Sequence, residues 1–135
     1  MASSLLVDTG FIVALLSRRD RHHGWATAQA TRHPPPWRTC ESVLSEVFHL
    51  LGRWGRPALV ELVRRGAVAP GLDLADGLEP VLNLLHKYAN VPMSLADACL
   101  VRMTETLAAP LLLTTDTDFR VYRRHSRQIV PTVMP

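Results

Sequence analysis

Two short apolar runs that each end in an aspartate constrain the fold of this chain more than any other feature. Residues 4–8 read SLLVD, and residues 111–116 read LLLTTD. An apolar run of this length, closed by polar residues, is typical of a strand buried on both faces of a parallel sheet. Because ligands bind outside the carboxyl ends of parallel strands, we expect Asp8 and Asp116 to lie at the same edge of one sheet.

Between these runs, the 3.6-residue spacing of apolar side chains predicts mostly helices. The expected helices cover residues 9–17, 20–33 with Asp20 as N-cap, 41–54, 57–66, 76–90, and a last range that starts after Ser94. Further strands are expected at 37–40, at 68–74 despite Pro70 and Gly71, and at 128–133. Strands that alternate with helices predict an α/β fold, a three-layer α/β/α sandwich with a mostly parallel central sheet. The length of 135 residues fits a single domain over residues 1–135.

Two further acids fall at the margins of apolar helix faces. Glu46 lies beside the face of the helix at 41–54, and Asp97 borders the face of the helix after Ser94. Clustered carboxylates raise one another's pKa, and a divalent cation removes that cost. Oxygen ligands favour Mg²⁺ or Mn²⁺, which can generate a nucleophile from water and stabilise charge on a phosphodiester. The pattern therefore indicates a metal-dependent phosphodiester hydrolase.

Each acid taken alone also has a simpler interpretation. Asp8 could be a turn or cap residue, and Asp97 could be the third-position acid of a capping box with Ser94. Glu46 could be a solvated helix residue, and Asp116 could be an N-cap. The combination of the four acids favours the metal site over these separate roles.

Several segments, in this order and at this spacing, resemble the PIN-domain family and within it the VapC-type bacterial toxins. They are LLVDTGFIVALL (5–16), DRHHGWA (20–26), TCESVLSEVFHLL (39–51), SLADACLVRM (94–103) and LLLTTDTDF (111–119). The resemblance implies an endoribonuclease that holds Mg²⁺ or Mn²⁺ and acts as the toxin of a type II toxin–antitoxin pair. It also implies a small antitoxin and a homodimer as partners. The implied metal ligands are Asp8, Glu46, Asp97 and Asp116.

Other residues near these acids are candidates for supporting roles. Thr9, Thr114 and Thr115 could orient the carboxylates or serve as ordinary turn residues. Asp118 could act through water or a second metal, or cap the following turn. The resemblance also implies that Asp20 and His23 brace the second helix. The segment VAPGLDLADG is broken by proline and glycine where the family usually has a cleaner strand.

Basic and apolar surfaces suggest what the protein binds. The chain carries a net charge of +3 with fourteen Arg and one Lys, and arginine suits phosphate contact. Arg120, Arg123 and Arg124 follow Asp116 closely and could bind RNA phosphates or form a solvated face. The helices at 41–54 and 57–66 could leave an apolar groove, which the resemblance assigns to dimerisation and antitoxin binding, or could simply pack inside the molecule.

Two other functions compete with this interpretation. Asp116 and Asp118 form the Asp-x-Asp pair of haloacid-dehalogenase-like phosphatases, but that function leaves Asp8, Glu46 and Asp97 unexplained. A non-catalytic PIN-like module that binds RNA or protein would not need all four acids. No apolar run reaches membrane-spanning length, and the first residues lack a basic leader, so we expect a cytoplasmic protein. Cys40 and Cys99 are expected to be reduced, buried thiols.

Overall fold

A five-stranded sheet forms the centre of the molecule. The structure, a computed structural model, describes residues 4–135. The strands lie in the order β3-β2-β1-β4-β7, and each neighbouring pair is parallel. Their bounds are β1 (Leu5–Val7), β2 (Trp37–Thr39), β3 (Val68–Pro70), β4 (Leu111–Leu113) and β7 (Thr132–Val133).

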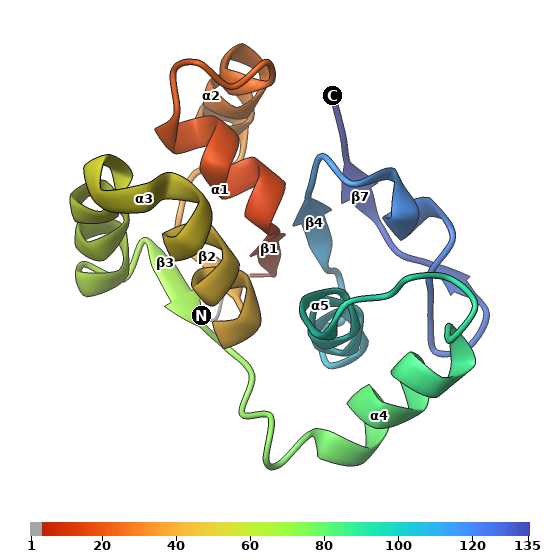
Figure 1. Cartoon of the computed structure of the whole chain (residues 1–135). Helices are drawn as coiled ribbons and strands as arrows, with labels where there is room; N and C mark the ends of the chain where they lie inside the picture. Colours follow the sequence, from red (N-terminus) through yellow and green to blue (C-terminus); the bar gives the residue numbers. More distant parts are fainter. Residues whose placement is uncertain (1–3) are drawn as a thin grey trace.

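Helices cover the sheet in two groups. The first group packs together and comprises α1 (Thr9–Leu16), α2 (His23–Arg32) and α3 (Glu41–Arg64). The second group comprises α4 (Leu78–Lys87), α5 (Leu95–Glu105), the 3₁₀ turn η1 (Thr117–Arg120), and the hairpin of β5 (Arg123–Arg124) and β6 (Gln128–Ile129). In Figure 1 the first group is coloured red to yellow-green and the second green to blue.

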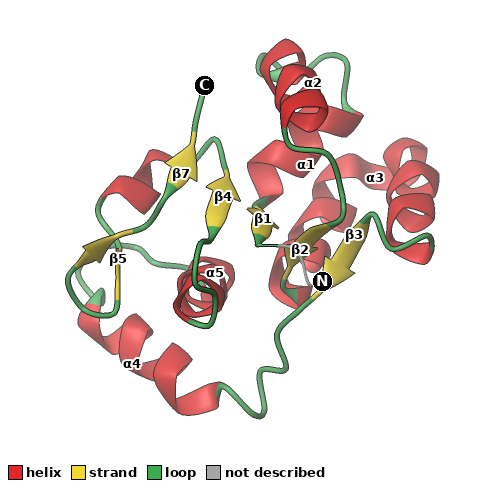
Figure 2. Ribbon diagram, turned by 180° about the vertical axis from the view of Figure 1, so that it is seen from behind, coloured by secondary structure: helices red, strands yellow, loops and turns green. Residues whose placement is uncertain are grey.

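The strand order explains why these two groups lie on opposite faces. From β1 the chain steps outward to β2 and β3, and it then returns past β1 to reach β4 and β7. Crossovers between parallel strands are right-handed, so connections that run in opposite directions place their helices on opposite faces. This confirms the predicted three-layer α/β/α sandwich. Figure 2 shows β5 standing apart from the central sheet, beside α5.

The buried strands and α1 form the core. Leu6 and Val7 of β1 pair with Leu112 and Leu113 of β4, and all four side chains are fully buried. Phe11 of α1 packs edge-on against Trp37 of β2, with ring centroids 5.4 Å apart. Such continuous burial explains why both strands read as uninterrupted apolar runs.

The two helices predicted at 41–54 and 57–66 meet in α3. The backbone of Gly52 has φ 62° and ψ −165°, so the helix changes direction there. Pro57 lies inside α3 instead of starting a separate helix. The break falls at Gly52 because glycine adopts positive φ without steric cost.

Three other boundaries differ from the sequence-based expectation. Asp20 does not cap α2, which begins at His23; its Oδ1 accepts a hydrogen bond from the backbone N–H of His22 at 2.8 Å. Strand β3 ends at Pro70, and the strand expected at 128–133 is divided into β6 and β7. Proline has no N–H with which to continue a ladder, and Pro131 interrupts the last segment in the same way.

Some smaller expectations agree with the structure. His23 braces α2 against α1, because its Nδ1 lies 2.8 Å from the carbonyl oxygen of Ala14. Cys40 and Cys99 are both buried and free. In the described part of the chain, every helix is too short or too polar to cross a bilayer.

Candidate active site

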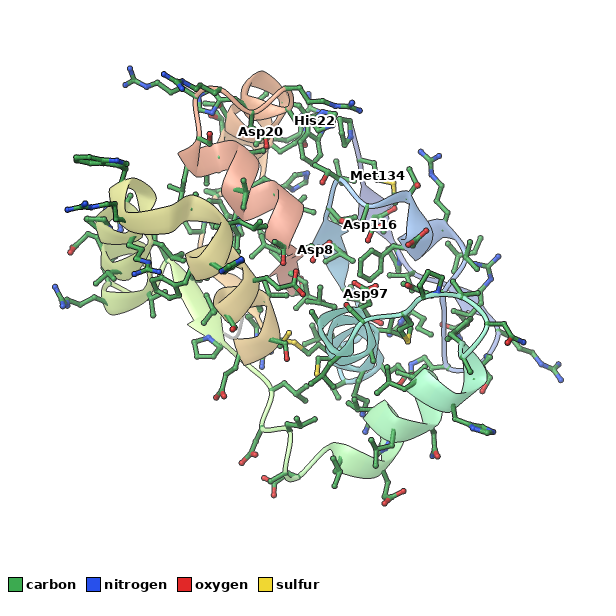
Figure 3. All side chains as sticks on the ribbon, in the orientation of Figure 1. Asp8, Asp20, His22, Asp97, Asp116 and Met134 are labelled. Carbon is green, nitrogen blue, oxygen red and sulfur yellow. The ribbon has the colours of Figure 1, made fainter. Side chains whose placement is uncertain are left out.

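The predicted acids gather around one pocket at the carboxyl ends of β1 and β4. The pocket has a volume of about 390 Å³, and its lining includes Asp8, Glu46, Asp97, Asp116 and Asp118. Figure 3 shows Asp8, Asp97 and Asp116 near one another, whereas Asp20 and His22 lie farther away. Asp8 and Asp116, 108 positions apart in the sequence, are therefore brought together by the parallel pairing of β1 with β4.

Asp8 leaves the end of β1 and is almost fully buried, with 5% of its surface exposed. Its Oδ1 accepts the backbone N–H of Thr9 at 2.7 Å, which also caps α1. Its Oδ2 accepts the hydroxyl of Thr114 at 2.8 Å. Burial raises the pKa of Asp8 to about 7, although these two hydrogen bonds act in the opposite direction and the nearby Asp97 and Asp116 add to the rise.

Thr114 connects Asp8 with Asp116. The Oγ1 that donates to Asp8 also accepts the backbone N–H of Asp116 at 2.9 Å. Asp116 Oδ1 in turn accepts the N–H of Asp118 at 2.8 Å, so Asp116 is the N-cap of η1. Asp116 is therefore an N-cap, as its simpler interpretation from the sequence suggested. This role uses only one of its two carboxylate oxygens.

Asp97 lies in the first turn of α5, where the predicted capping box is present. Its N–H donates to Ser94 Oγ at 3.0 Å, and its Oδ2 accepts the N–H of Ser94 at 3.3 Å. Oδ2 also accepts the hydroxyl of Tyr122 at 2.9 Å. Burial raises the pKa of Asp97 despite these donors. The capping role and a place in the pocket are therefore compatible in one side chain.

Glu46 is exposed on α3, yet it is tied to the pocket by Thr9. The hydroxyl of Thr9 donates to Glu46 Oε2 at 3.0 Å. Thr115 lines the pocket and lies against Gly10, where an added Cβ would collide with the Thr115 hydroxyl oxygen. Of the three predicted supporting threonines, Thr9 and Thr114 donate directly to an acid, and Thr115 donates to none in residues 4–135.

Within residues 4–135, the acids of the pocket have no cationic partners. The ion pairs among residues 4–135 are Arg64–Glu61 and Arg102–Glu105, and neither involves the pocket. Within the same range, one oxygen of Asp97 (Oδ1), of Asp116 (Oδ2) and of Glu46 (Oε1) receives no protein donor. An all-oxygen pocket with unpaired carboxylates suits a hard divalent cation.

The acids do not form a closed cage. Across the described residues, no three His, Cys, Asp or Glu side chains are already placed closely enough to hold a metal ion by themselves. Mg²⁺ usually keeps several waters and binds through one or two carboxylates. The donor set therefore fits an ion that is bound partly through water.

The predicted phosphate-binding arginines lie outside this pocket lining and differ from one another. Arg124 is 8% exposed, and its Nη2 donates to the carbonyl oxygens of Thr104 at 2.5 Å and Leu107 at 2.9 Å. This structural role at the end of α5 differs from the RNA contact predicted for Arg124. The guanidinium of Arg123 donates to backbone carbonyls of residues 120–122, and Arg120 is exposed.

Tyr122 is the residue of this site that the sequence did not reveal. In the sequence it lies among the arginines that follow Asp116, but the structure buries its side chain completely beside Asp97. The two residues are 25 positions apart, so no helical or strand spacing links them. The aromatic run of Phe119 and Tyr122, three residues apart, is the one local sign of burial.

An apolar groove lies between the end of α1 and α3; its lining includes residues of the predicted helix at 41–54 but none of the predicted helix at 57–66. It has a volume of about 360 Å³, and Leu50, Leu51 and Trp54 contribute to its lining together with Arg18 and Arg19. Trp54 is 88% exposed and Leu50 is 61% exposed. These apolar side chains are thus not used for internal packing.

Comparison with known proteins agrees with the fold and the order of the motifs. The family model described as the PIN domain matches residues 5–124. The crystal structure of Mycobacterium tuberculosis VapC20, a toxin that cleaves the sarcin–ricin loop, superposes with a TM-score of 0.77 at 25% identity. The match covers 87% of this chain and 93% of that one. No curated protein matches the sequence. The chain therefore belongs to the PIN-domain family, and within that family it resembles the VapC-type toxins.

Proposed function

We propose that this protein is a Mg²⁺- or Mn²⁺-dependent endoribonuclease, the toxin of a type II toxin–antitoxin pair, and that residues 1–135 form one ribonuclease domain. The observation that carries the proposal is the pocket at the carboxyl end of the parallel sheet. Five acids line it, and none has a cationic partner among residues 4–135. Buried like charges are costly unless something compensates them, and a divalent cation would do so.

The residues that would hold the cation are Asp8, Glu46, Asp97 and Asp116. When bound, such an ion supplies a nucleophile from water near neutral pH and stabilises the charge that develops on the phosphodiester. The surrounding hydrogen bonds orient the acids: Thr114 and the Thr9 N–H hold Asp8, and the Thr9 hydroxyl holds Glu46. Asp118 lines the same pocket, where its carboxylate would act through water or a second ion.

RNA is the proposed substrate, and the proposed location is the cytoplasm. Similarity to VapC20, an RNA-cleaving toxin, supports this substrate class. The net charge of +3 is also consistent with a polyanionic partner. Of the three candidate arginines, Arg120 is the exposed one, so it is the best candidate for phosphate contact.

The proposed protein partners are a small antitoxin and a second copy of this chain. The groove between α1 and α3 supports both, since exposed Trp54 and Leu50 are unusual on a surface that stays free. Arg18 and Arg19 at its rim would attract an acidic partner segment.

The proposed activity is tested by incubating the purified protein with cellular RNA, with Mn²⁺ or with EDTA. We expect cleavage in Mn²⁺ and none in EDTA. Asp97→Asn and Asp116→Asn should each lose about 10³-fold in rate, since a metal contributes several kcal/mol of transition-state stabilisation. Asp20→Asn, an acid outside the pocket, should cleave normally.

Mapping of RNA ends in cells that express the wild type or Asp8→Asn extends the test. Cuts should disappear in the variant. Cleavage that persists in EDTA, or in the Asp8, Asp97 or Asp116 variants at near wild-type rates, would contradict the metal mechanism. RNA binding without Mn²⁺-dependent cleavage would instead identify a non-catalytic binding module.

A further inference from the structure

The hydroxyl of Tyr122 is buried at the edge of the acidic pocket. The Tyr122 side chain has no exposed surface, and its hydroxyl donates to Asp97 Oδ2 at 2.9 Å. A phenol carries its proton at neutral pH, and Asp97 Oδ2 can only accept, so the Tyr122 hydroxyl is the donor in this contact.

The ring of Tyr122 is fixed on two sides. Phe119 packs edge-on against it with ring centroids 5.3 Å apart, and Tyr88 does so at 5.2 Å. Tyr88 uses its own hydroxyl elsewhere, to accept the backbone N–H of Arg123 at 2.8 Å. Because both neighbours hold the ring, the direction in which the Tyr122 hydroxyl points is set by packing.

The two carboxylate oxygens of Asp97 have different surroundings. Oδ2 accepts both the Ser94 N–H at 3.3 Å and the Tyr122 hydroxyl at 2.9 Å. Oδ1 receives no donor from the described part of the chain. The shorter of the two contacts comes from Tyr122, so removing this hydroxyl would leave the carboxylate held only by the longer one from Ser94.

We propose that Tyr122 is a positioning residue for the cation site: its hydroxyl holds Asp97 by Oδ2 and leaves Oδ1 free for a divalent cation. The inference rests on the proposed function, since it assumes that Asp97 is a cation ligand. Groups that orient metal ligands change metal affinity 10- to 100-fold when they are removed. A tyrosine that only fills the core would not have this effect once its ring is kept.

The test compares Tyr122→Phe with Tyr88→Phe. Both variants keep an aromatic ring and lose one buried hydroxyl from the same cluster, but only the Tyr122 hydroxyl contacts an acid of the pocket. The readout is the Kd for Mn²⁺ of the RNA-free protein, measured by calorimetry on variants whose urea unfolding is cooperative. We expect about a 10-fold weaker Kd for Tyr122→Phe and less than about a twofold change for Tyr88→Phe.

A double-mutant cycle checks that Tyr122 acts through Asp97. In an Asp97→Asn background, adding Tyr122→Phe should change the Mn²⁺ Kd by less than about twofold. With RNA, the rate of Tyr122→Phe should fall at low Mn²⁺ and recover at saturating Mn²⁺. An unchanged Kd in Tyr122→Phe, or an equal loss in Tyr88→Phe, would overturn the inference.

The outcomes also separate this inference from the proposed function. Weaker Mn²⁺ binding in Tyr122→Phe, in a protein that cleaves no RNA, would support the positioning role and refute the ribonuclease. Normal Mn²⁺-dependent cleavage together with an unchanged Kd in Tyr122→Phe would refute only the positioning role. A wild type that binds no Mn²⁺ would overturn the inference together with the metal site.

Discussion

A buried charge lies at each end of α5, and the two charges have opposite signs and different surroundings. At the C-terminal end, the guanidinium of Arg124 donates to the carbonyl oxygens of Thr104 and Leu107 and to Gln128 Oε1. At the N-terminal end, Asp97 shares a pocket with four other acids and has no cationic partner in residues 4–135. Both charges suit the helix dipole, so the dipole does not account for the difference.

The difference shows that the fold gains stability at the Arg124 end of α5 and loses stability at the acidic end. Arg124 supplies a donor to the carbonyl oxygen of Leu107 and the closest donor to that of Thr104, which also accepts the Leu107 N–H at 3.4 Å. The acids lower the stability of the metal-free protein, because burial raises the pKa of both Asp8 and Asp97. Arrangements of that kind are typical of functional sites.

The largest effect on stability is expected at the Arg124 end. Arg124→Met would remove the side-chain donor to the Leu107 carbonyl oxygen and would leave that of Thr104 with only long backbone contacts such as the Leu107 N–H at 3.4 Å. An unsatisfied buried group costs about 1–3 kcal/mol. We expect the free energy of unfolding in urea to fall by about 3 kcal/mol. Arg120→Met, at an exposed position, serves as the control and should change it by less than about 0.5 kcal/mol. Equal stability of the two variants would remove the contrast between the ends of α5.

A smaller effect of opposite sign is expected at the acidic end. Asp8→Asn removes a charge whose burial raises the pKa to about 7 from the ordinary 3.8, and the amide oxygen can still accept the Thr9 N–H. In EDTA we expect the variant to be more stable than the wild type by about 2 kcal/mol at pH 8, measured by urea unfolding. The same variant should have lost cleavage. A destabilised Asp8→Asn would mean that its hydrogen bonds outweigh the cost of the charge.

The smallest effect is a pH dependence of the metal-free protein. Because the folded pKa of Asp8 lies above the unfolded value, the folded state takes up a proton first as the pH falls. The contribution of Asp8 to stability should therefore increase by about 1 kcal/mol between pH 8 and pH 6. Asp97, whose pKa is also raised, acts in the same direction. The measurement is the difference in the free energy of unfolding between the wild type and Asp8→Asn at each pH. The titration of the histidines contributes equally to both proteins and cancels in this difference. A difference that does not vary with pH would refute the raised pKa of Asp8.

Local patterns were enough to predict most of what positions the site. The apolar runs before Asp8 and Asp116 became β1 and β4, and the Ser94–Asp97 capping box is present. What could not be predicted depends on contacts between distant residues. Tyr122 reaches Asp97 because β5, which follows it directly, packs on α5.

The role of Arg124 also depends on contacts between distant residues that the local sequence does not show. In the sequence it belongs to an exposed-looking basic stretch, and only the hairpin of β5 and β6 turns it toward the end of α5. Charge alone therefore does not distinguish an arginine that stabilises the fold from one that is free to contact a substrate.

The hydroxyl of Thr114 has a consequence for how the acids move relative to each other. One oxygen atom both donates to Asp8 and accepts from the backbone of Asp116. The carboxylate of Asp8 and the backbone of Asp116 are therefore anchored to the same atom. Because the Thr114 side chain is fully buried, water does not compete for either of these hydrogen bonds.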